Sequence, residues 1–337
     1  MAGRCLVHLA SGVGNIVLAT PLLIALDELG CEVHVFLDAD YAQTADLLRP
    51  WSVVHSVHGG GLAELAPLLR AESGSAGEWD VIVPAAPPFY WPRFARAYAG
   101  PVAQAAGRAR VLPRPRERLF AADEQAFYLS FAHTLGYPNV ARPMPYLPIA
   151  PRESETRVGE RTVVLAPGCK TGTMAAKRWP WFAQLAERFD DVVVVGTGDD
   201  LSRADLSGPP LRFPPHVRSF IDRLTLRETA ELMTGAAVVV GNDSGLSHIA
   251  AACGVATVML FGPTDDRCLG PLPPNATVLR AGLPCEPCWT AAPLAACAKR
   301  VDCLARLDVD RVERTVRGLL NVEIEENRDE CAGLRAR

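Results

Sequence analysis

The residues best suited to chemistry stand in one polar run, GNDSGLSH at positions 241–248. It follows the apolar stretch 236–240, which is typical of a buried parallel strand, and precedes an apolar helix that Asp243 or Ser244 could cap. A helix that begins there points unpaired backbone N–H groups and the positive end of its dipole out of the sheet edge, which suits a phosphate group. Ser244 and His248, four residues apart, lie on one face of its first turn. An ordinary capped helix with a core histidine fits the same run.

A second run of this kind, PGCKTGT at positions 167–173, also comes directly after an apolar strand. Gly168 allows a ligand to approach the backbone, and the hydroxyls of Thr171 and Thr173 can donate to phosphate oxygens. Lys177 adds a positive point charge, unless it is simply a solvated residue ahead of the next helix. Since both runs follow parallel strands, they meet at the carboxyl edge of one sheet and together predict a nucleotide diphosphate site.

Two further loops could hold the rest of a nucleotide. Asp199 follows the apolar run 192–195 and offers a carboxylate to ribose hydroxyls. Thr225 stands just before a helix, where it could line a base. Both placements compete with a plain structural role, in which these residues only make turns and helix caps.

The elements that must position these residues alternate between strands and helices along the chain, which predicts a parallel α/β fold. A polar linker near residues 150–161 predicts two domains, 1–150 and 151–337. The second domain is expected to end in a helix at 309–320 and a frayed, charged tail.

Between residues 85 and 120 this alternation is interrupted by an aromatic, proline-rich segment and then by many arginines. The region is either a solvated loop or a mobile acceptor-binding insertion. In the second case, arginines such as Arg93 and Arg96 would meet an anionic or polyhydroxylated partner.

Composition disfavours several classes of protein. The chain has 337 residues, 49% of them hydrophobic, with a net charge of −4 and a pI near 6.0, so nothing indicates a nucleic-acid partner. No apolar stretch is long enough to cross a membrane and the first residues run straight into a strand, which predicts a soluble, cytoplasmic protein. Residues 12–14 begin like a dinucleotide fingerprint but lack its third glycine, which disfavours an NAD-dependent oxidoreductase. The oligomeric state stays open.

Taken in order, the motifs resemble glycosyltransferase family 9, the ADP-heptose-dependent heptosyltransferases of bacteria. The resemblance covers almost the whole chain and is strongest from residue 163 to residue 265. It rests on the following segments: Gly12-Val13-Gly14-Asn15 with Thr20-Pro21, Pro167-Gly168, Lys177-Arg178-Trp179-Pro180, the run from Gly241 to His248, and Phe261-Gly262-Pro263-Thr264-Asp265.

The resemblance implies two facing Rossmann-like domains of the glycosyltransferase B type and an inverting enzyme that needs no divalent metal for catalysis. ADP-heptose would bind to the second domain, where Lys177 and the loop from Asp243 through Gly245 to His248 match residues that hold the donor diphosphate. Lys177 and His248 are also expected to act in catalysis. The acceptor would bind to the first domain, around Gly12, Gly14 and Asn15, with Arg93 and Arg96 nearby.

Position 15 departs from the family. Members usually have an aspartate there, the expected general base for the acceptor hydroxyl, whereas Asn15 cannot take a proton. Three explanations stay open: another group serves as base, the acceptor is an amine or other nucleophile that needs less activation, or the protein binds donor with little turnover. Candidates for a replacement base are His8, Asp38, Asp40 and Asp80.

Four of the ten cysteines, Cys285, Cys288, Cys297 and Cys303, form a C-x2-C-x8-C-x5-C pattern. Four thiolates could coordinate a structural zinc or iron ion that takes no part in catalysis. Free thiols or a disulfide are the alternatives, because the spacing of the second pair is not that of a standard zinc ribbon.

The sequence therefore predicts an inverting transfer of heptose from ADP-heptose to an acceptor. The acceptor is either a glycolipid, the lipopolysaccharide inner core, or a small molecule such as a natural product, an aminoglycoside-like sugar or a nucleoside. Two other functions stay open: a nucleotide-sugar epimerase of the same fold, and a nucleotide-sugar-binding protein with little turnover.

Overall fold

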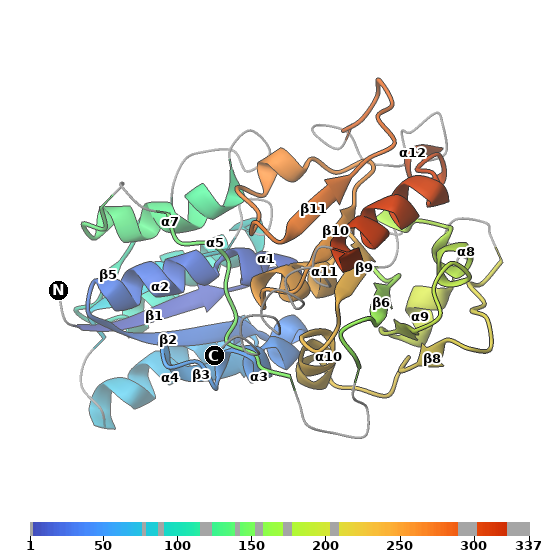
Figure 1. The fold of residues 1–337 in the computed structure, drawn as a ribbon. Coiled ribbons are helices and arrows are strands. Elements are labelled where there is room, and N and C mark those ends of the chain that lie inside the picture. The colour runs from blue at the N-terminus through green and yellow to red at the C-terminus, as the bar shows by residue number, and fades with distance from the viewer. Residues whose placement is uncertain are drawn as a thin grey trace, which may run out of the picture. The chain divides into compact units, whose positions relative to one another are not determined.

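The computed structural model describes residues 3–75, 79–86, 91–114, 123–138, 142–151, 158–170, 177–202, 209–288 and 302–321 of the chain. The chain divides into two compact units (Figure 1). Unit 1 comprises Met1–Pro148 and Arg267–Leu272, and unit 2 comprises Ile149–Asp266 and Pro273–Arg337. Each unit contains one sheet whose paired strands all run parallel, which confirms the predicted α/β class.

Unit 1 has a five-stranded sheet with the strand order β3-β2-β1-β4-β5. In chain order the strands are β1 (Gly3–Leu9), β2 (Cys31–Asp38), β3 (Val54–Gly60), β4 (Val81–Pro84) and β5 (Arg110–Val111). β1 lies between β2 and β4, and its residues from Cys5 to Leu9 are almost fully buried. Strands of a parallel sheet that is covered on both faces are buried along their length in this way.

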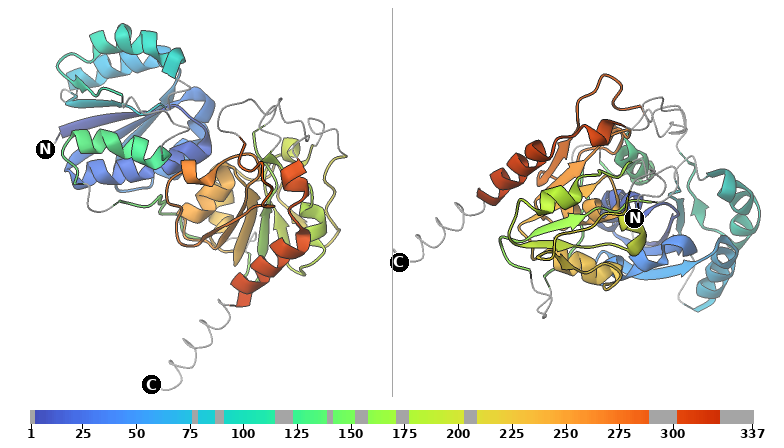
Figure 2. Two further views of the ribbon diagram at one scale, coloured as in Figure 1. Left: turned by 90° about the horizontal axis from the view of Figure 1, so that it is seen from above. Right: turned by 90° about the vertical axis from the view of Figure 1, so that its right-hand side faces the viewer.

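The helices of unit 1 cover both faces of this sheet (Figure 2). α2 and α7 pack together on one face, and α4 and α6 pack together on the other. The helices are α1 (Val13–Leu18), α2 (Thr20–Glu28), α3 (Ala45–Leu48), α4 (Leu62–Ser75), α5 (Trp91–Ala99), α6 (Pro101–Ala105) and α7 (Glu124–Thr134), with a 3-10 helix, η1, at Ala39–Thr44.

Part of the region that was expected to interrupt the α/β alternation is regular structure. α5 and α6 occupy most of residues 91–105, and Phe94, Tyr98 and Val102 are buried in the apolar core of unit 1. Phe94 and Tyr98 are four residues apart, which is the spacing of one face of α5. The solvated-loop alternative is therefore wrong for this stretch, because apolar side chains between the arginines recur at the helical period and are buried.

Unit 2 has a six-stranded sheet with the order β11-β10-β9-β6-β7-β8. In chain order the strands are β6 (Val163–Ala166), β7 (Val192–Val194), β8 (Arg218–Ser219), β9 (Val238–Asn242), β10 (Thr257–Leu260) and β11 (Ala276–Leu279). In each unit the chain begins in mid-sheet, moves to one side and then to the other, so the order reverses beside β1 and beside β6. Open parallel sheets bind ligands at the carboxyl ends of strands at such reversal points.

The helices of unit 2 include one that the sequence pattern predicted near its end. Residues 309–321 are helical, and Val312 and Val316 are buried in one core with Phe182 and Leu185 of α8. Among the described helices, none is both long and apolar enough to span a bilayer. The other helices are α8 (Phe182–Ala186), α9 (Gly198–Leu201), α10 (Leu226–Met233), α11 (Gly245–Ala252) and α12 (Asp302–Ala305). A 3-10 helix, η4 (Asp266–Cys268), begins in unit 2 and continues into unit 1.

A short segment from the second half of the chain belongs to unit 1. Within Arg267–Leu272, the Pro271 carbonyl accepts a hydrogen bond from Gln125 Nε2 at 2.9 Å. Gly270 has a φ of 92° and lies so close to Asp123 that a side chain would collide with it. Nothing in the sequence indicated this return, because it depends on contacts between residues far apart along the chain.

Candidate active site

The loops of unit 2 that were predicted to bind phosphate meet at the reversal point of its sheet. β6 and β9 are neighbours, with Ala166 paired to Gly241, so the residues that follow both strands leave the sheet at the same edge. α11 begins three residues after the end of β9, with Ser244 as its N-cap residue and Gly245 as its first residue. Thr171 and Thr173 of the other loop lie outside the described residues.

Asn242 fastens three segments of this edge together. Its side chain is fully buried, and its Nδ2 donates to the Pro167 carbonyl at 2.7 Å. Its Oδ1 accepts from the Trp179 backbone N–H at 2.9 Å. A buried amide with partners at both ends holds the two loops and the segment before α8 in one arrangement. Asn242 was not among the site residues predicted from the sequence, although a polar residue at the end of a valine-rich strand is typical of a functional sheet edge.

Asp243 is the charged centre of the site. Its Oδ2 accepts from Lys177 Nζ at 2.9 Å and from Thr264 Oγ1 at 2.8 Å, and its Oδ1 lies 3.3 Å from His248 Nε2. Asp243 and His248 are buried, and the Lys177 side chain is 15% exposed. Burial alone would raise the pKa of Asp243, but the Lys177 ammonium and the His248 imidazole outweigh it and hold that pKa well below its usual range.

This arrangement is suited to binding an anion. Asp243 holds the Lys177 ammonium in place, and an ammonium group can donate to several acceptors at once. The start of α11 adds backbone N–H groups and the positive end of a helix dipole. The Thr264 hydroxyl donates to Asp243 and so brings the loop after β10 into the site. The sequence indicated Thr264 only as part of a family motif.

The neighbours of Lys177 in its motif have structural roles. The buried Arg178 guanidinium donates from Nη1 to the Ser202 carbonyl at 2.6 Å and from Nη2 to the Cys169 carbonyl at 3.0 Å. It thereby ties the loop after β6 to the end of α9. Trp179 is almost fully buried, and its indole N–H donates to the Leu307 carbonyl at 2.9 Å. Arg178 and Trp179 therefore stabilise the surrounding backbone, whereas Lys177 contacts Asp243 in the site.

The remaining donor-binding candidates have mixed positions. Gly168 lies against the Asp200 carboxyl group, where any side chain would collide, so this glycine is needed for packing within the protein. Asp199 is exposed on α9. The Thr225 hydroxyl accepts from the Glu228 N–H at 3.2 Å and caps α10, which is the structural role that the sequence left open.

The reversal point of unit 1 lies beside β1, where residues 11–15 lead into α1. Gly12 is the N-cap residue, and a side chain there would lie 3.1 Å from Asn15 Oδ1. Asn15 Nδ2 donates to Glu124 Oε1 at 2.5 Å, and the Tyr128 hydroxyl donates to the same oxygen at 3.0 Å. Glu124 is the first residue of α7 and is only 6% exposed. Glu124 was not among the site residues predicted from the sequence, although an acidic residue at the start of an apolar helix could be seen there.

Among the replacement bases considered from sequence, His8 is part of an aromatic cluster. It is fully buried, its ring packs against Phe36 and Phe94, and its Nδ1 lies 2.8 Å from the Tyr98 hydroxyl. Burial raises the pKa of Tyr98 well above its usual value, so the phenol stays protonated as a hydrogen-bond partner.

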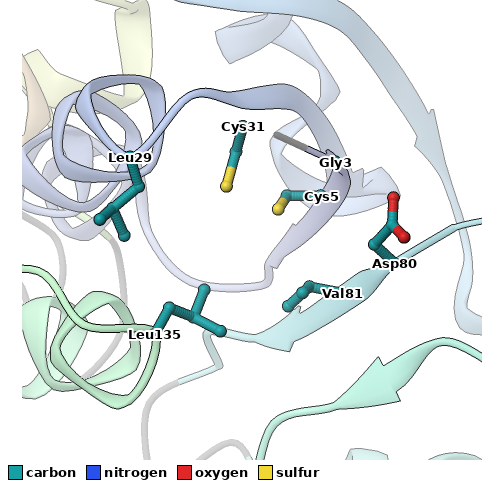
Figure 3. Close-up of a pocket in the computed structure, with 7 residues that line it drawn as sticks. All are labelled: Gly3, Cys5, Leu29, Cys31, Asp80, Val81 and Leu135. Carbon is teal, nitrogen blue, oxygen red and sulfur yellow. The ribbon is translucent and has the colours of Figure 1, made fainter. Parts of the chain in front are cut away.

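The three aspartates considered as replacement bases lie at different places in unit 1. Asp38 accepts from the Asp40 N–H at 3.3 Å at the start of η1, and Asp40 itself is exposed. Asp80 comes just before β4, at the amino edge of the sheet and therefore at the opposite edge from Asn15. It lines a cavity of about 50 Å³ together with Cys5 and Cys31 (Figure 3).

The other acceptor-side candidates are placed only in part. Gly14 lies in the first turn of α1, and Arg96 is exposed on α5. Arg93 belongs to the same helix, but its side chain lies outside the described part of the structure. The predicted role of the two arginines in acceptor binding therefore stays a prediction.

The four clustered cysteines are described only in part. Cys285 and Cys288 are exposed, and Cys303 is buried beside Gly262, where a side chain would meet its sulfur at 2.9 Å. Cys297 falls in residues 289–301, outside the described ranges. A structural metal bound by all four thiolates thus also stays a prediction.

Comparison with known proteins identifies the family. Residues 122–298, just over half of the chain, match Glycosyltransferase family 9 (heptosyltransferase). The chain therefore belongs to this family. The matched region includes Glu124, Lys177 and the loop from Asp243 to His248, whereas Asn15 precedes it.

The individual relatives agree with this assignment. Lipooligosaccharide heptosyltransferase 2 of Haemophilus influenzae is 34% identical over 159 residues, which cover 40% of this chain and 44% of that protein. Lipopolysaccharide heptosyltransferase 1 of Pseudomonas aeruginosa is 32% identical over 123 residues, 34% of each protein. The chain thus spans less than half the length of these two relatives.

The solved structures support the fold. The structure of Escherichia coli ADP-heptose lps heptosyltransferase II has a TM-score of 0.68 with this chain, covering 95% of this chain and 99% of the other at 21% identity. The two-sheet fold expected from the resemblance is therefore confirmed.

Proposed function

We propose that the chain is an inverting glycosyltransferase that moves heptose from ADP-heptose to an acceptor. One observation carries the proposal: the buried Asp243 holds Lys177, Thr264 and His248 together at the start of α11. Membership of glycosyltransferase family 9 and the names of the heptosyltransferase relatives support heptose as the transferred sugar. In this proposal unit 2 binds the donor and unit 1 binds the acceptor.

Lys177, Asp243 and the start of α11 each have a defined task in the proposed reaction. As the bond between the sugar and the diphosphate breaks, negative charge builds on the leaving phosphate oxygen. The Lys177 ammonium and the N–H groups at the start of α11 stabilise that charge, and Asp243 keeps Lys177 in position. Because these groups are already fixed before the reaction, they need little rearrangement as the charge develops.

The acceptor is the part of the proposal with the widest choice. The curated relatives are lipopolysaccharide and lipooligosaccharide heptosyltransferases by name, so the lipopolysaccharide inner core is the first acceptor to test. Small aglycones, aminoglycoside-like sugars and nucleosides form the second group. A nucleotide-sugar epimerase is not favoured by the family match.

The test is a mass-spectrometric screen of ADP-heptose and of UDP- and GDP-linked sugars against both acceptor groups. We expect ADP-heptose to be consumed with release of ADP, and calorimetry to show ADP binding by the wild-type protein. Lys177→Ala should weaken ADP binding about 10-fold or more, since a charge-assisted contact is worth about 1.5–3 kcal/mol. Arg188→Ala, which removes an exposed partner of Asp310, is the matched control and should bind ADP as the wild type does. Consumption of only a non-ADP donor, or unchanged ADP binding by Lys177→Ala, would contradict the proposal.

A further inference from the structure

Unit 1 contains a carboxylate in contact with the residue that replaces the family's aspartate. Asn15 donates from Nδ2 to Glu124 Oε1 at 2.5 Å, across 109 positions of the chain. Resting on the proposed function, we propose that Glu124 is the general base of the reaction and that Asn15 is its positioning residue. The carboxylate that members of the family usually carry on α1 would here be supplied by α7.

The surroundings of Glu124 fit this role. Two groups, the Asn15 amide and the Tyr128 hydroxyl, donate to the same oxygen of its carboxylate and so fix the orientation of the carboxyl group. Oriented in this way, the Glu124 carboxyl group holds a fixed position beside residue 15. A carboxylate can take a proton from an acceptor hydroxyl, whereas an amide cannot.

The identity of residue 15 follows from the same contact. An aspartate at position 15 would place a second carboxyl oxygen where Nδ2 now lies, 2.5 Å from Glu124 Oε1. Two carboxylates that close cannot both be ionised, and one of them would have to hold a proton. Asparagine removes this conflict and supplies a donor instead. Asn15 and Glu124 therefore act as one unit, in which an amide orients the carboxylate.

The chemical step balances with no further reagent. The acceptor oxygen attacks the anomeric carbon of heptose and forms the new glycosidic bond, while the bond between that carbon and the phosphate oxygen breaks. ADP leaves with the electron pair of the broken bond. The acceptor proton passes to the Glu124 carboxylate, which later releases it to solvent.

The experiment compares three variants with the wild type, using ADP-heptose and heptose-free lipopolysaccharide or whichever acceptor the screen identifies. Glu124→Gln should lower kcat by about 10²–10⁴-fold, the usual contribution of a general base, with ADP affinity unchanged. Asn15→Asp should shift the acid limb of the pH–rate profile to higher pH, because two neighbouring carboxyl groups then share a proton. The double variant Asn15→Asp/Glu124→Gln exchanges the two groups and should regain about 10-fold or more of the kcat lost in Glu124→Gln.

Glu28→Gln is the matched control. Like Glu124, Glu28 is a carboxylate of unit 1 that accepts a hydrogen bond from a tyrosine: the Tyr137 hydroxyl donates to its Oε2 at 2.7 Å. It ends α2, next to the amino end of β2, so this change should leave kcat and the pH profile as in the wild type. Thermal unfolding of all variants checks that each one is folded.

The outcomes separate this inference from the proposed function. If the wild type transfers heptose and Glu124→Gln keeps kcat within about 3-fold, Glu124 is not the base although the function stands. A double variant no more active than Glu124→Gln would refute the shared role of the two positions. If the wild type neither binds ADP nor releases it from ADP-heptose, the proposed function fails and Glu124 has no such reaction to serve.

Discussion

Each unit of the molecule holds one buried carboxylate at the reversal point of its sheet, and the two carboxylates differ in their partners. In unit 2, Asp243 accepts from the Lys177 ammonium at 2.9 Å. In unit 1, Glu124 accepts from the Asn15 amide at 2.5 Å and from the Tyr128 hydroxyl at 3.0 Å. Asp243 thus has a cation among its partners, whereas the Asn15 amide and the Tyr128 hydroxyl are two neutral donors to Glu124.

This difference indicates two different uses for the same chemical group. A neighbouring ammonium stabilises only the ionised form of a carboxylate, so Asp243 stays an anion and its task is to hold Lys177. The Asn15 amide and the Tyr128 hydroxyl both donate to one Glu124 oxygen and fix the orientation of its carboxyl group, which suits a group that must meet an acceptor proton at a set position. The buried carboxylate therefore has a positioning role in unit 2 and, by our inference, a catalytic role in unit 1.

The largest effect is expected from Asp243→Ala. Removing one partner of a buried ion pair leaves the other charge without compensation, which costs about 3–5 kcal/mol of unfolding free energy. We expect that loss in chemical denaturation, together with loss of ADP binding in calorimetry. Asp310→Ala, which breaks only the exposed pair with Arg188, should change the unfolding free energy by less than about 0.5 kcal/mol. An Asp243→Ala protein as stable as the wild type would show that the pair is not a fixed part of unit 2.

Acidification should weaken unit 2 through the same residue. The pKa of Asp243 is lower in the folded protein than in the unfolded chain, where it is about 3.9. Its contribution to stability is therefore fully present above about pH 4 to 5 and is lost as the pH falls toward the folded pKa. The difference in unfolding free energy between the wild type and Asp243→Asn, measured from pH 7 down to pH 3, should be constant at first and then shrink. If that difference in unfolding free energy grew on acidification, the pKa of Asp243 would be raised in the folded protein, contrary to our expectation.

The smallest effects, and the sharpest contrast, are expected from removing one hydroxyl donor in each unit. Thr264→Val and Tyr128→Phe each delete one hydrogen bond to a carboxylate, worth about 1.5 kcal/mol or roughly a factor of 10. Thr264→Val should raise the Kd for ADP with little change in kcat, and Tyr128→Phe should lower kcat with the Kd for ADP unchanged. Calorimetry and steady-state kinetics measure both quantities. If both variants change the same quantity, the division of roles between the two carboxylates is wrong.

Much of the proposed donor site could be predicted because its residues lie close together in sequence or directly after strands. Asp243, Ser244 and His248 belong to one strand-loop-helix unit, and the order of strands and helices alone placed them at a sheet edge. Thr225 shows the limit of that reasoning, since the same local pattern fits a nucleotide contact and a helix cap, and here the hydroxyl caps α10.

The proposed acceptor site could not be predicted in the same way. Position 15 was recognisable as a departure from the family, yet its partner Glu124 lies 109 positions away. Of the proposed substitutes, Asp80 is on the wrong edge of the sheet and His8 is enclosed by aromatic rings. Sequence spacing carries no information about which distant side chains meet.

By itself, the sequence determined the parallel α/β class, the polar loops after the strands and the family resemblance, because these depend on local hydrophobic period and short motifs. Only the tertiary structure decided which groups share a site: Thr264 with Asp243, and Glu124 with Asn15. It also decided that Arg267–Leu272 belongs to unit 1. The physical reason is that charge pairing and hydrogen bonding depend on distance in space, which the packing of each sheet and its helices sets.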